Sequence, residues 1–183
     1  GKYKILGETR DDAAGECFDK TGRILGLGYP GGPKIAAEAA KFLISLDAKR
    51  TPRRVASQFL IKLPRPMIYQ KNYDFSFSGL KTAVLYNYKN QPEKMNKFLA
   101  SESRKSKKYI REMSFEVQQA VIDVLISKTL KAAKEFKAKS IILGGGVAAN
   151  NELRKQFGEK INKELSNIPG RLQTDSPKVC YLI

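Results

Sequence analysis

The 183-residue chain contains no histidine, which excludes histidine-based triads, histidine metal ligands and imidazole acid–base chemistry within this stretch. Its two cysteines, Cys17 and Cys180, lie too far apart for a Cys-x-x-Cys site, so neither a disulfide framework nor a cysteine zinc site is indicated. No apolar run reaches the roughly 18 residues of a membrane span, and the first residues lack the apolar core of a signal peptide. We therefore expect a cytoplasmic protein without a membrane partner.

Acidic residues are scarce beside basic ones. The chain has 34 Lys and Arg against 18 Asp and Glu, a formal charge of +16, and its 42% hydrophobic content suffices for a packed core. Residues 48–73 contain Arg53, Arg54 and other basic groups but no acid, and a second cluster includes Lys107 and Lys108. Clustered cations attract phosphate polyanions, so nucleic acid is the natural partner. The alternative is a solvated basic surface, and charge alone does not choose between them.

The apolar spacing predicts an α/β protein. Helix, strand, glycine turn and helix follow one another in the last third of the chain, which indicates a layered α/β structure. The expected helices are 11–25, 34–46, 114–136 and 150–165, with a further one after residue 79; the expected strands are 3–6, 74–78 and 140–143. We expect a loop over the Gly- and Pro-rich residues 26–33, a helical insertion with connecting loops around 51–66, and an exposed helix or loop over 90–108.

A run of glycines follows the predicted strand 140–143. Gly144, Gly145 and Gly146 lack the Cβ that blocks backbone approach, and Asn150 stands where the next helix begins. This arrangement suits a nucleotide, because a helix N-terminus offers free N–H groups to an anion. It is neither a G-x-G-x-x-G motif nor a P-loop. The alternative is an ordinary β–α turn with Asn150 as the helix cap. The pair Gly31 and Gly32 likewise permits a ligand to approach the backbone.

Two further groups of polar side chains are candidates for chemistry. Asp12, Glu16 and Asp19 share one side of the first predicted helix and could bind a metal, a ribose hydroxyl or an amine, although such a face is more often only solvated. Residues 76–81 place two serines near Lys81, which formally permits a Ser/Lys pair. No histidine base is available, so a packing loop is the better interpretation of that segment.

Three separated segments resemble one family in order and spacing. They are residues 6–33, then Phe75-Ser-Phe-Ser-Gly-Leu-Lys-Thr82, then Gly144-Gly-Gly-Val-Ala-Ala-Asn-Asn-Glu-Leu-Arg154. The family is that of the tRNA threonylcarbamoyladenosine transferases, formerly labelled O-sialoglycoprotein endopeptidases, and the resemblance runs from about residue 3 to about residue 168. It implies an actin/sugar-kinase/chaperone-type ATPase fold of two ribonuclease-H-like lobes, incomplete here and with a helical insertion.

The resemblance also implies a reaction and a site. The family transfers a threonylcarbamoyl group from threonylcarbamoyl-AMP to the N6 amine of the adenosine 3′ to the anticodon, in tRNAs that read codons starting with A. By matching position, Asp19 and Gly32 contact the ligand from one side of a cleft and Asn150 from the other, with Gly31 and the glycine turn nearby. The ligand is threonylcarbamoyl-AMP, or ATP or AMP, and the basic middle third faces tRNA.

The resemblance further implies a divalent metal, iron or zinc, in the full-length family member. Its ligands, a histidine pair in the N-terminal lobe and the Asp of a Cys-Thr-Asp-Asn block, are missing from this chain, so we expect no metal site here. The implied partners are tRNA, a synthase that supplies threonylcarbamoyl-AMP, and helper proteins, which in bacteria are an inactive paralogue and a small P-loop ATPase.

We expect three parts in the chain. Residues 1–35 would end the N-terminal lobe and carry the ligand loop, 36–112 would form the basic helical insertion and connecting segment, and 113–183 would form a truncated C-terminal lobe. We hypothesise truncation at both ends, with a frameshift near the C-terminus, and a fragment that is inactive alone. The alternatives are a non-catalytic module that binds nucleotide or tRNA, and a metalloendopeptidase, as the older family label has it.

Overall fold

The computed structural model describes residues 3–47, 61–90, 104–165 and 179–181. They form five α-helices, a 3-10 helix and two short strands. In chain order these are α1 (Ala14–Ile24), α2 (Gly31–Asp47), α4 (Ser78–Lys89), α6 (Arg104–Glu135), β1 (Ile141–Leu143), the 3-10 helix η1 (Gly146–Ala149), α7 (Asn151–Leu165) and β2 (Val179–Tyr181). The described part is therefore mostly helical, and the predicted insertion around 51–66 falls largely outside it.

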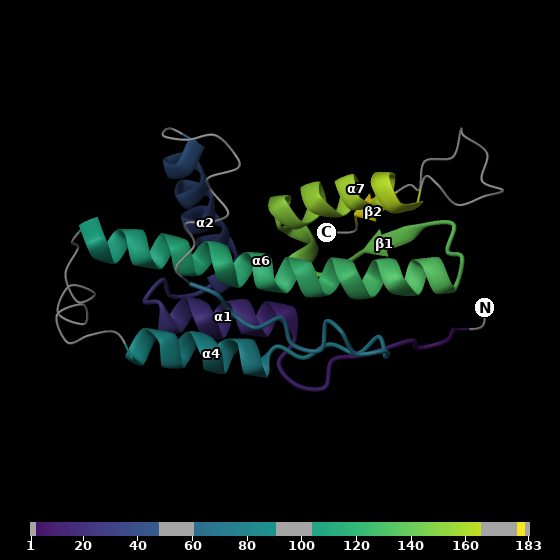
Figure 1. Ribbon diagram of the computed structural model, residues 1–183, viewed down its shortest axis with the longest axis horizontal. Coiled ribbons are helices and arrows are strands. Elements are labelled where there is room, and N and C mark those ends of the chain that lie inside the picture. Colours follow the sequence, from purple (N-terminus) through teal and green to yellow (C-terminus); the bar gives the residue numbers. More distant parts are fainter. Residues whose placement is uncertain (1–2, 48–60, 91–103, 166–178, 182–183) are drawn as a thin grey trace.

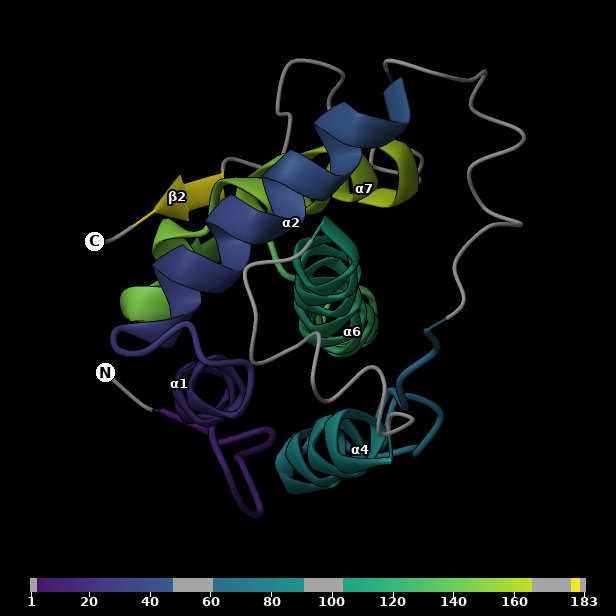
Figure 2. The ribbon, with the colours of Figure 1, turned by 90° about the vertical axis from the view of Figure 1, so that its left-hand side faces the viewer.

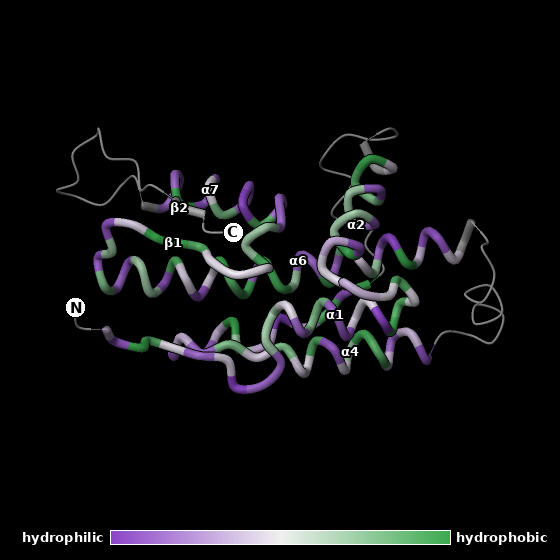
Figure 3. Tube along the Cα trace, turned by 180° about the vertical axis from the view of Figure 1, so that it is seen from behind, coloured by the Kyte–Doolittle hydropathy of each residue, from purple (hydrophilic) through white to green (hydrophobic). Residues whose placement is uncertain are grey.

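The long helix α6 is the centre of the arrangement. Helices α1 and α4 lie along one side of it, while β1 and α7 lie along the other (Figure 1). Helix α2 runs crosswise to α6 and packs against it, as the end-on view in Figure 2 shows. Hydrophobic and hydrophilic residues alternate along α6 (Figure 3), which is the pattern of a helix with packed faces. The helix can therefore contribute to two cores at once.

Two apolar clusters hold the helices together. The first joins α1, α4 and the first half of α6, and includes Cys17, Phe18, Leu80, Val84, Met113, Val117 and Val121. The second joins the second half of α6 to α7, and includes Ile122, Ile126, Leu130, Leu153, Phe157 and Ile161. Full burial of one such side chain stabilises the folded state by roughly 1.5–3 kcal/mol. The fourfold spacing along residues 150–165 correctly predicted α7 and its buried face.

Helix α6 begins ten residues earlier than the sequence pattern predicted. Of the residues expected to form an exposed helix or loop over 90–108, the structure describes residue 90 and the helical residues 104–108, where Lys107 and Lys108 are exposed and Ser106 is buried. The buried Glu112 and Glu116 accept the backbone N–H groups of Ile61 and Leu63 at 3.2 and 3.1 Å. A carboxylate that satisfies a distant backbone donor can be buried. The apolar pattern alone therefore did not show where α6 begins.

The expected strand at residues 3–6 is absent from the described structure. Tyr3 and Ile5 are almost fully exposed, and no described strand pairs with them. Backbone pairing occurs further along, in an isolated parallel bridge between Thr9 and Phe75. A strand needs a partner for its N–H and C=O groups. The apolar pattern at 3–6 therefore does not suffice to form one.

The expected strand at 74–78 is also wrong, because only Phe75 forms a bridge and helix α4 already begins at Ser78. The carboxylate of Asp11 accepts the N–H groups of Phe77 and Ser78 at 2.8 and 3.1 Å, which satisfies donors at the start of α4. The strand predicted at 140–143 is confirmed as β1. It pairs in parallel with β2, with Ile142 opposite Cys180.

Two remaining expectations concern membrane spans and the division of the chain into parts. No helix within the described ranges is long and apolar enough to cross a membrane. The predicted divisions after residues 35 and 112 fall inside α2 and α6, and the three-part division stays a prediction.

Candidate functional site

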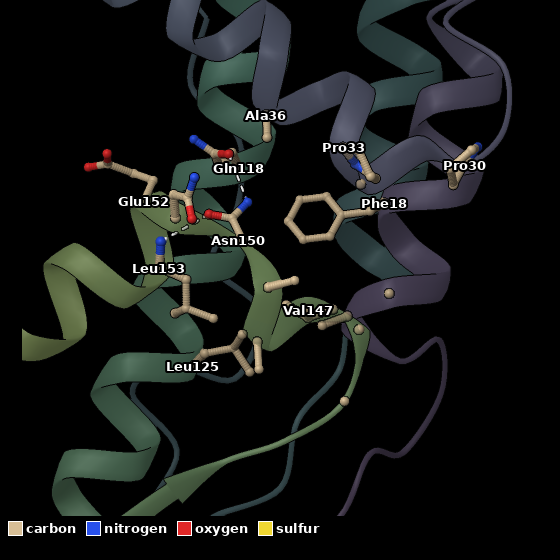
Figure 4. Close-up of a pocket in the computed structure, with 18 of the residues that line it drawn as sticks. Phe18, Pro30, Pro33, Ala36, Gln118, Leu125, Val147, Asn150, Glu152 and Leu153 are labelled. Carbon is tan, nitrogen blue, oxygen red and sulfur yellow. Dashed lines mark hydrogen bonds between the residues drawn. The ribbon is translucent and has the colours of Figure 1, made fainter. Parts of the chain in front are cut away.

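A cavity of about 1070 Å³ lies between the α1–α2 pair and the glycine turn that leads through η1 to α7 (Figure 4). Five of the six candidate ligand residues line it: Asp19, Gly32, Gly145, Gly146 and Asn150. They come from segments more than a hundred positions apart in the sequence. The structure thus brings together the two groups of residues that sequence reasoning singled out. Their contact with a ligand stays a prediction.

Asp19 links the two helices on one side of the cavity. It lies in α1, and its Oδ1 accepts the backbone N–H of Gly31 at 2.7 Å. Gly31 is the first residue of α2, where backbone N–H groups have no partner within the helix. A carboxylate at this position also interacts favourably with the helix dipole. Asp19 therefore holds the start of α2 beside the cavity.

The predicted loop over 26–33 is too long, because Gly31, Gly32 and Pro33 form the first turn of α2. Proline is tolerated there, since its missing N–H has no partner in the first turn. A Cβ on Gly31 would stand 2.2 Å from the carbonyl oxygen of Phe18, so Gly31 permits α1 and α2 to approach closely. Gly31 itself is not among the residues that line the cavity, and its contact with a ligand stays a prediction.

Gly32 and the glycine turn have open space on the side where a Cβ would project. A Cβ on Gly32 would come no closer than 3.9 Å to Phe18, and one on Gly145 or Gly146 would meet nothing within 4 Å. Gly145 has φ +84°, a left-handed conformation that favours glycine. Packing within the protein therefore does not account for the missing side chains at Gly32 and Gly146.

Asn150 is hydrogen-bonded at both ends of its amide. Its Oδ1 accepts the backbone N–H of Leu153 at 2.9 Å, which makes Asn150 the N-cap of α7. Its Nδ2 donates to Oε1 of Gln118, also at 2.9 Å. The cap that the sequence pattern offered as an alternative is therefore formed. An Asn amide has two donors and two acceptor lone pairs, so one of each remains for another partner.

The rest of the cavity wall is mainly apolar. Helix α2 contributes small side chains and Leu43, and in Figure 4 Phe18, Pro33 and Ala36 lie across from Asn150 and Leu153. Gln118, from the middle of α6, is buried in this wall. Sequence reasoning missed Gln118. The available signal was a polar residue within the densely apolar stretch from 114 to 136.

The three carboxylates predicted on one helix face do not form one site. Asp12 and Glu16 both pair with Lys20 at 2.7 Å, and Asp12 also approaches Lys81 at 3.2 Å. The hydrogen bond from Lys20 holds the pKa of Asp12 below its ordinary value. Of the three, only Asp19 lines the cavity. In the described ranges, no cluster of three or more His, Cys, Asp or Glu residues could hold a metal ion.

The serines near Lys81 bind a carboxylate instead of forming a nucleophile pair. Ser76 and Ser78 both donate their hydroxyl protons to Oδ2 of Asp11. Desolvation by its neighbours raises the pKa of Asp11, but the hydrogen bonds from the two hydroxyls and from the Phe77 and Ser78 backbone outweigh that effect and lower the pKa to about 2. Burial likewise raises the pKa of the Cys17 thiol to about 12, so Cys17 is inert at neutral pH. These residues are structural.

The basic residues predicted to face tRNA are only partly described. Lys107 and Lys108 are exposed near the start of α6, and neither lines the cavity. Arg53 and Arg54 lie outside the described residues. A tRNA contact for these four side chains stays a prediction.

Comparison with known proteins identifies relatives over nearly the whole chain. The family model described as tRNA N6-adenosine threonylcarbamoyltransferase matches residues 1–176. Proteins of that name from Desulfotalea psychrophila and Dehalococcoides mccartyi are 43% and 42% identical over 161 and 179 residues, which cover 88% and 98% of this chain. The chain spans only 41% and 46% of those two relatives. It belongs to the tRNA N6-adenosine threonylcarbamoyltransferase family.

Proposed function

We propose that this chain supplies the adenylate-binding part of an enzyme that modifies tRNA. The reaction is transfer of the threonylcarbamoyl group from threonylcarbamoyl-AMP to the N6 amine of the adenosine 3′ to the anticodon. One observation carries the proposal: Asp19 and Gly32 line the same cavity as Gly145, Gly146 and Asn150. An actin/sugar-kinase-type fold, with the ligand between two lobes, accounts for this convergence and is part of the proposal.

Each polar residue of the cavity has capacity left for an adenylate. Asp19 uses Oδ1 for the Gly31 N–H, which leaves its second oxygen to accept from a ribose hydroxyl. Asn150 retains one N–H and one lone pair beyond its bonds to Leu153 and Gln118. The positive end of α7 begins beside Asn150 and favours a phosphate. The glycines permit the ligand to approach the backbone.

The transfer step itself needs a positioned nucleophile. The N6 amine of the tRNA adenosine attacks the carbonyl carbon of threonylcarbamoyl-AMP, a C–N bond forms, and the C–O bond to the phosphate breaks. AMP leaves with the bonding electron pair, and the amine nitrogen loses a proton. The contribution of this chain is to hold the adenylate in an apolar cavity, where water competes less well with the amine.

A metal, tRNA and protein partners belong to the proposed whole enzyme. The described residues hold no donor set that fits an iron or zinc ion, so no step is assigned to a metal through this chain. Lys107 and Lys108, with Arg53 and Arg54, are the proposed tRNA-facing residues. The helper proteins and the synthase would act with the whole enzyme. We do not propose a metalloendopeptidase, because no described residue carries a feature that favours it.

The proposal is tested first by binding of AMP to the 183-residue chain, measured by calorimetry. Asn150→Asp should weaken binding, because it places a negative charge near the phosphate and replaces the amide donor. Asp19→Asn should weaken binding as well, since the carboxylate is the stronger acceptor for ribose hydroxyls. Glu16→Gln is the matched control, because Glu16 shares α1 with Asp19 and does not line the cavity. Equal affinities in all four proteins would refute the assignment.

Transfer activity separates the enzyme from a binding module. The chain is joined to those segments of a family member that it does not cover, and the product is assayed with threonylcarbamoyl-AMP, unmodified tRNA and the helper proteins. Formation of threonylcarbamoylated tRNA would support the transferase function. A folded chimera that binds AMP and gives no product supports the non-catalytic nucleotide-binding module.

A further inference from the structure

We infer that Gln118 is a positioning residue for Asn150: it fixes the orientation of the Asn150 amide, so that a donor and an acceptor of known identity face the cavity. This inference rests on the proposed function, because it concerns how the same cavity holds an adenylate. Gln118 lies in the middle of α6, is 3% exposed and lines the cavity. Gln118 therefore contacts Asn150 from α6, whereas Asn150 itself follows the glycine turn and η1.

The two hydrogen bonds of Asn150 determine which end of its amide is oxygen. The backbone N–H of Leu153 can only donate, so the atom facing it at 2.9 Å must be Oδ1. The amide nitrogen then faces α6, where Oε1 of Gln118 accepts one of its protons at 2.9 Å. In Figure 4 both bonds are drawn, and Asn150 lies between Gln118 and Leu153 at the cavity wall.

Removal of the Gln118 oxygen would release one end of this arrangement. The Asn150 nitrogen would lose its buried acceptor, and only the bond from the Leu153 N–H would still hold the amide in place. A hydrogen bond of this kind contributes about tenfold to an equilibrium at most when the partner is neutral. We therefore expect AMP affinity to fall by about fivefold to tenfold when Gln118 is replaced by an isosteric residue without an acceptor oxygen.

The neighbouring residue provides a matched control. Gln119 and Gln156 exchange two hydrogen bonds, at 2.9 and 2.8 Å, and so join α6 to α7 without touching Asn150. A substitution at Gln119 therefore loosens the same pair of helices and leaves the Asn150 amide in place. Gln118→Met and Gln119→Met are therefore substitutions of the same kind at adjacent positions. The first removes the bond to Asn150, and the second removes the bonds to Gln156.

The experiment measures AMP binding by calorimetry for the 183-residue chain and for the variants Gln118→Met, Gln119→Met, Asn150→Ala and Gln118→Met with Asn150→Ala. We expect Gln118→Met to weaken binding by about fivefold to tenfold and Gln119→Met to change it by less than twofold. In the Asn150→Ala background, Gln118→Met should have no additional effect, because a residue that acts through Asn150 is silent once Asn150 is gone.

The outcomes distinguish the two levels of the proposal. Absence of AMP binding by the unmodified chain would overturn the proposed function and this inference with it. Normal binding by Gln118→Met would overturn the inference alone. Additive losses in the double variant would mean that Gln118 contacts AMP directly or acts on the whole wall, which also overturns the positioning role.

A spectroscopic measurement keeps the inference testable if Gln118→Met does not fold. In the unmodified chain, an NMR contact between one side-chain amide proton of Asn150 and the side chain of Gln118 is expected. That proton should also exchange with water more slowly than its geminal partner. Equal exchange of the two protons, with no contact to Gln118, would overturn the inference.

Discussion

Gly31→Ala should destabilise the protein, whereas Gly32→Ala should not, although the two glycines are adjacent. A Cβ on Gly31 would lie 2.2 Å from the carbonyl oxygen of Phe18 and 2.7 Å from the Cα of Asp19. Both obstacles are backbone atoms, so α1 and α2 must move apart by about 1 Å to restore an ordinary contact. Overpacking of this kind costs about 1–3 kcal/mol, and a backbone obstacle favours the upper part of that range.

The gain in helix propensity offsets part of this cost. Alanine is favoured over glycine by at most about 1 kcal/mol in a helix, which leaves a net loss of about 2 kcal/mol. For a chain of this size that loss lowers Tm by about 4–8 °C. A Cβ on Gly32 comes no closer than 3.9 Å to Phe18, an ordinary contact, so Gly32→Ala is the matched control.

Thermal unfolding followed by circular dichroism at 222 nm measures both variants. The reasoning would be refuted if Gly31→Ala melted within about 1 °C of Gly32→Ala. The same melts in the presence of AMP separate packing from binding, because a ligand raises Tm only when it binds the folded state. A Gly32→Ala protein with normal Tm and no shift on AMP addition would connect Gly32 to the ligand.

Three further predictions concern Asp11, Lys128 and the basic surface. Asp11→Ala should cost about 1–2 kcal/mol, because it removes the acceptor for the Phe77 and Ser78 N–H groups at the start of α4. The folded-state pKa of Asp11, about 2, lies below the ordinary value of 3.8, so its stabilisation is present above about pH 4 and is lost as pH falls toward 2. Urea unfolding between pH 2 and 6 should therefore show a shallower acid decline for Asp11→Ala than for the unmodified chain. Lys128→Met should cost about 2–3 kcal/mol in the same assay at pH 7, because the buried ammonium donates to the carbonyl oxygens of Gln70 and Asn72 at 3.3 and 2.8 Å; the exposed Lys155→Met is its control, and equal stability of the two would contradict the prediction. Replacement of Arg53, Arg54, Lys107 and Lys108 by Glu should weaken tRNA binding and flatten its dependence on salt, and an unchanged salt slope in a filter-binding titration would identify a merely solvated basic surface.

Local chemistry made part of this structure predictable. Asn150 caps α7, as one of the two sequence-based interpretations had it, because a cap residue bonds within three positions of itself and needs no information from elsewhere in the chain. The buried faces of α6 and α7 followed from apolar spacing for the same reason. Family resemblance then grouped Asp19, Gly32 and Asn150, which pattern alone left with ordinary structural alternatives.

The missed features depend on partners far along the sequence. Helix α2 begins at Gly31 because Asp19 accepts its N–H from another helix. The early start of α6 is accompanied by burial of Glu112, which accepts a backbone donor from residue 61. Gln118 acquires its role from Asn150, 32 positions away. No local sequence pattern contains these pairings. They nevertheless accompany the starts of α2 and α6 and place a polar side chain, Gln118, in the cavity wall.

The hydrogen bond between Asp19 and Gly31 makes the backbone amide proton of Gly31 an internal reporter of the cavity. Its exchange with solvent depends on an acceptor that a ribose hydroxyl would share. A hydroxyl that donates to the other oxygen of Asp19 would compete for the same negative charge, so a ligand bound there should change the exchange rate of this proton. Hydrogen exchange at this single position therefore reports on the Asp19–Gly31 bond, which the start of α2 shares with the proposed ligand contact.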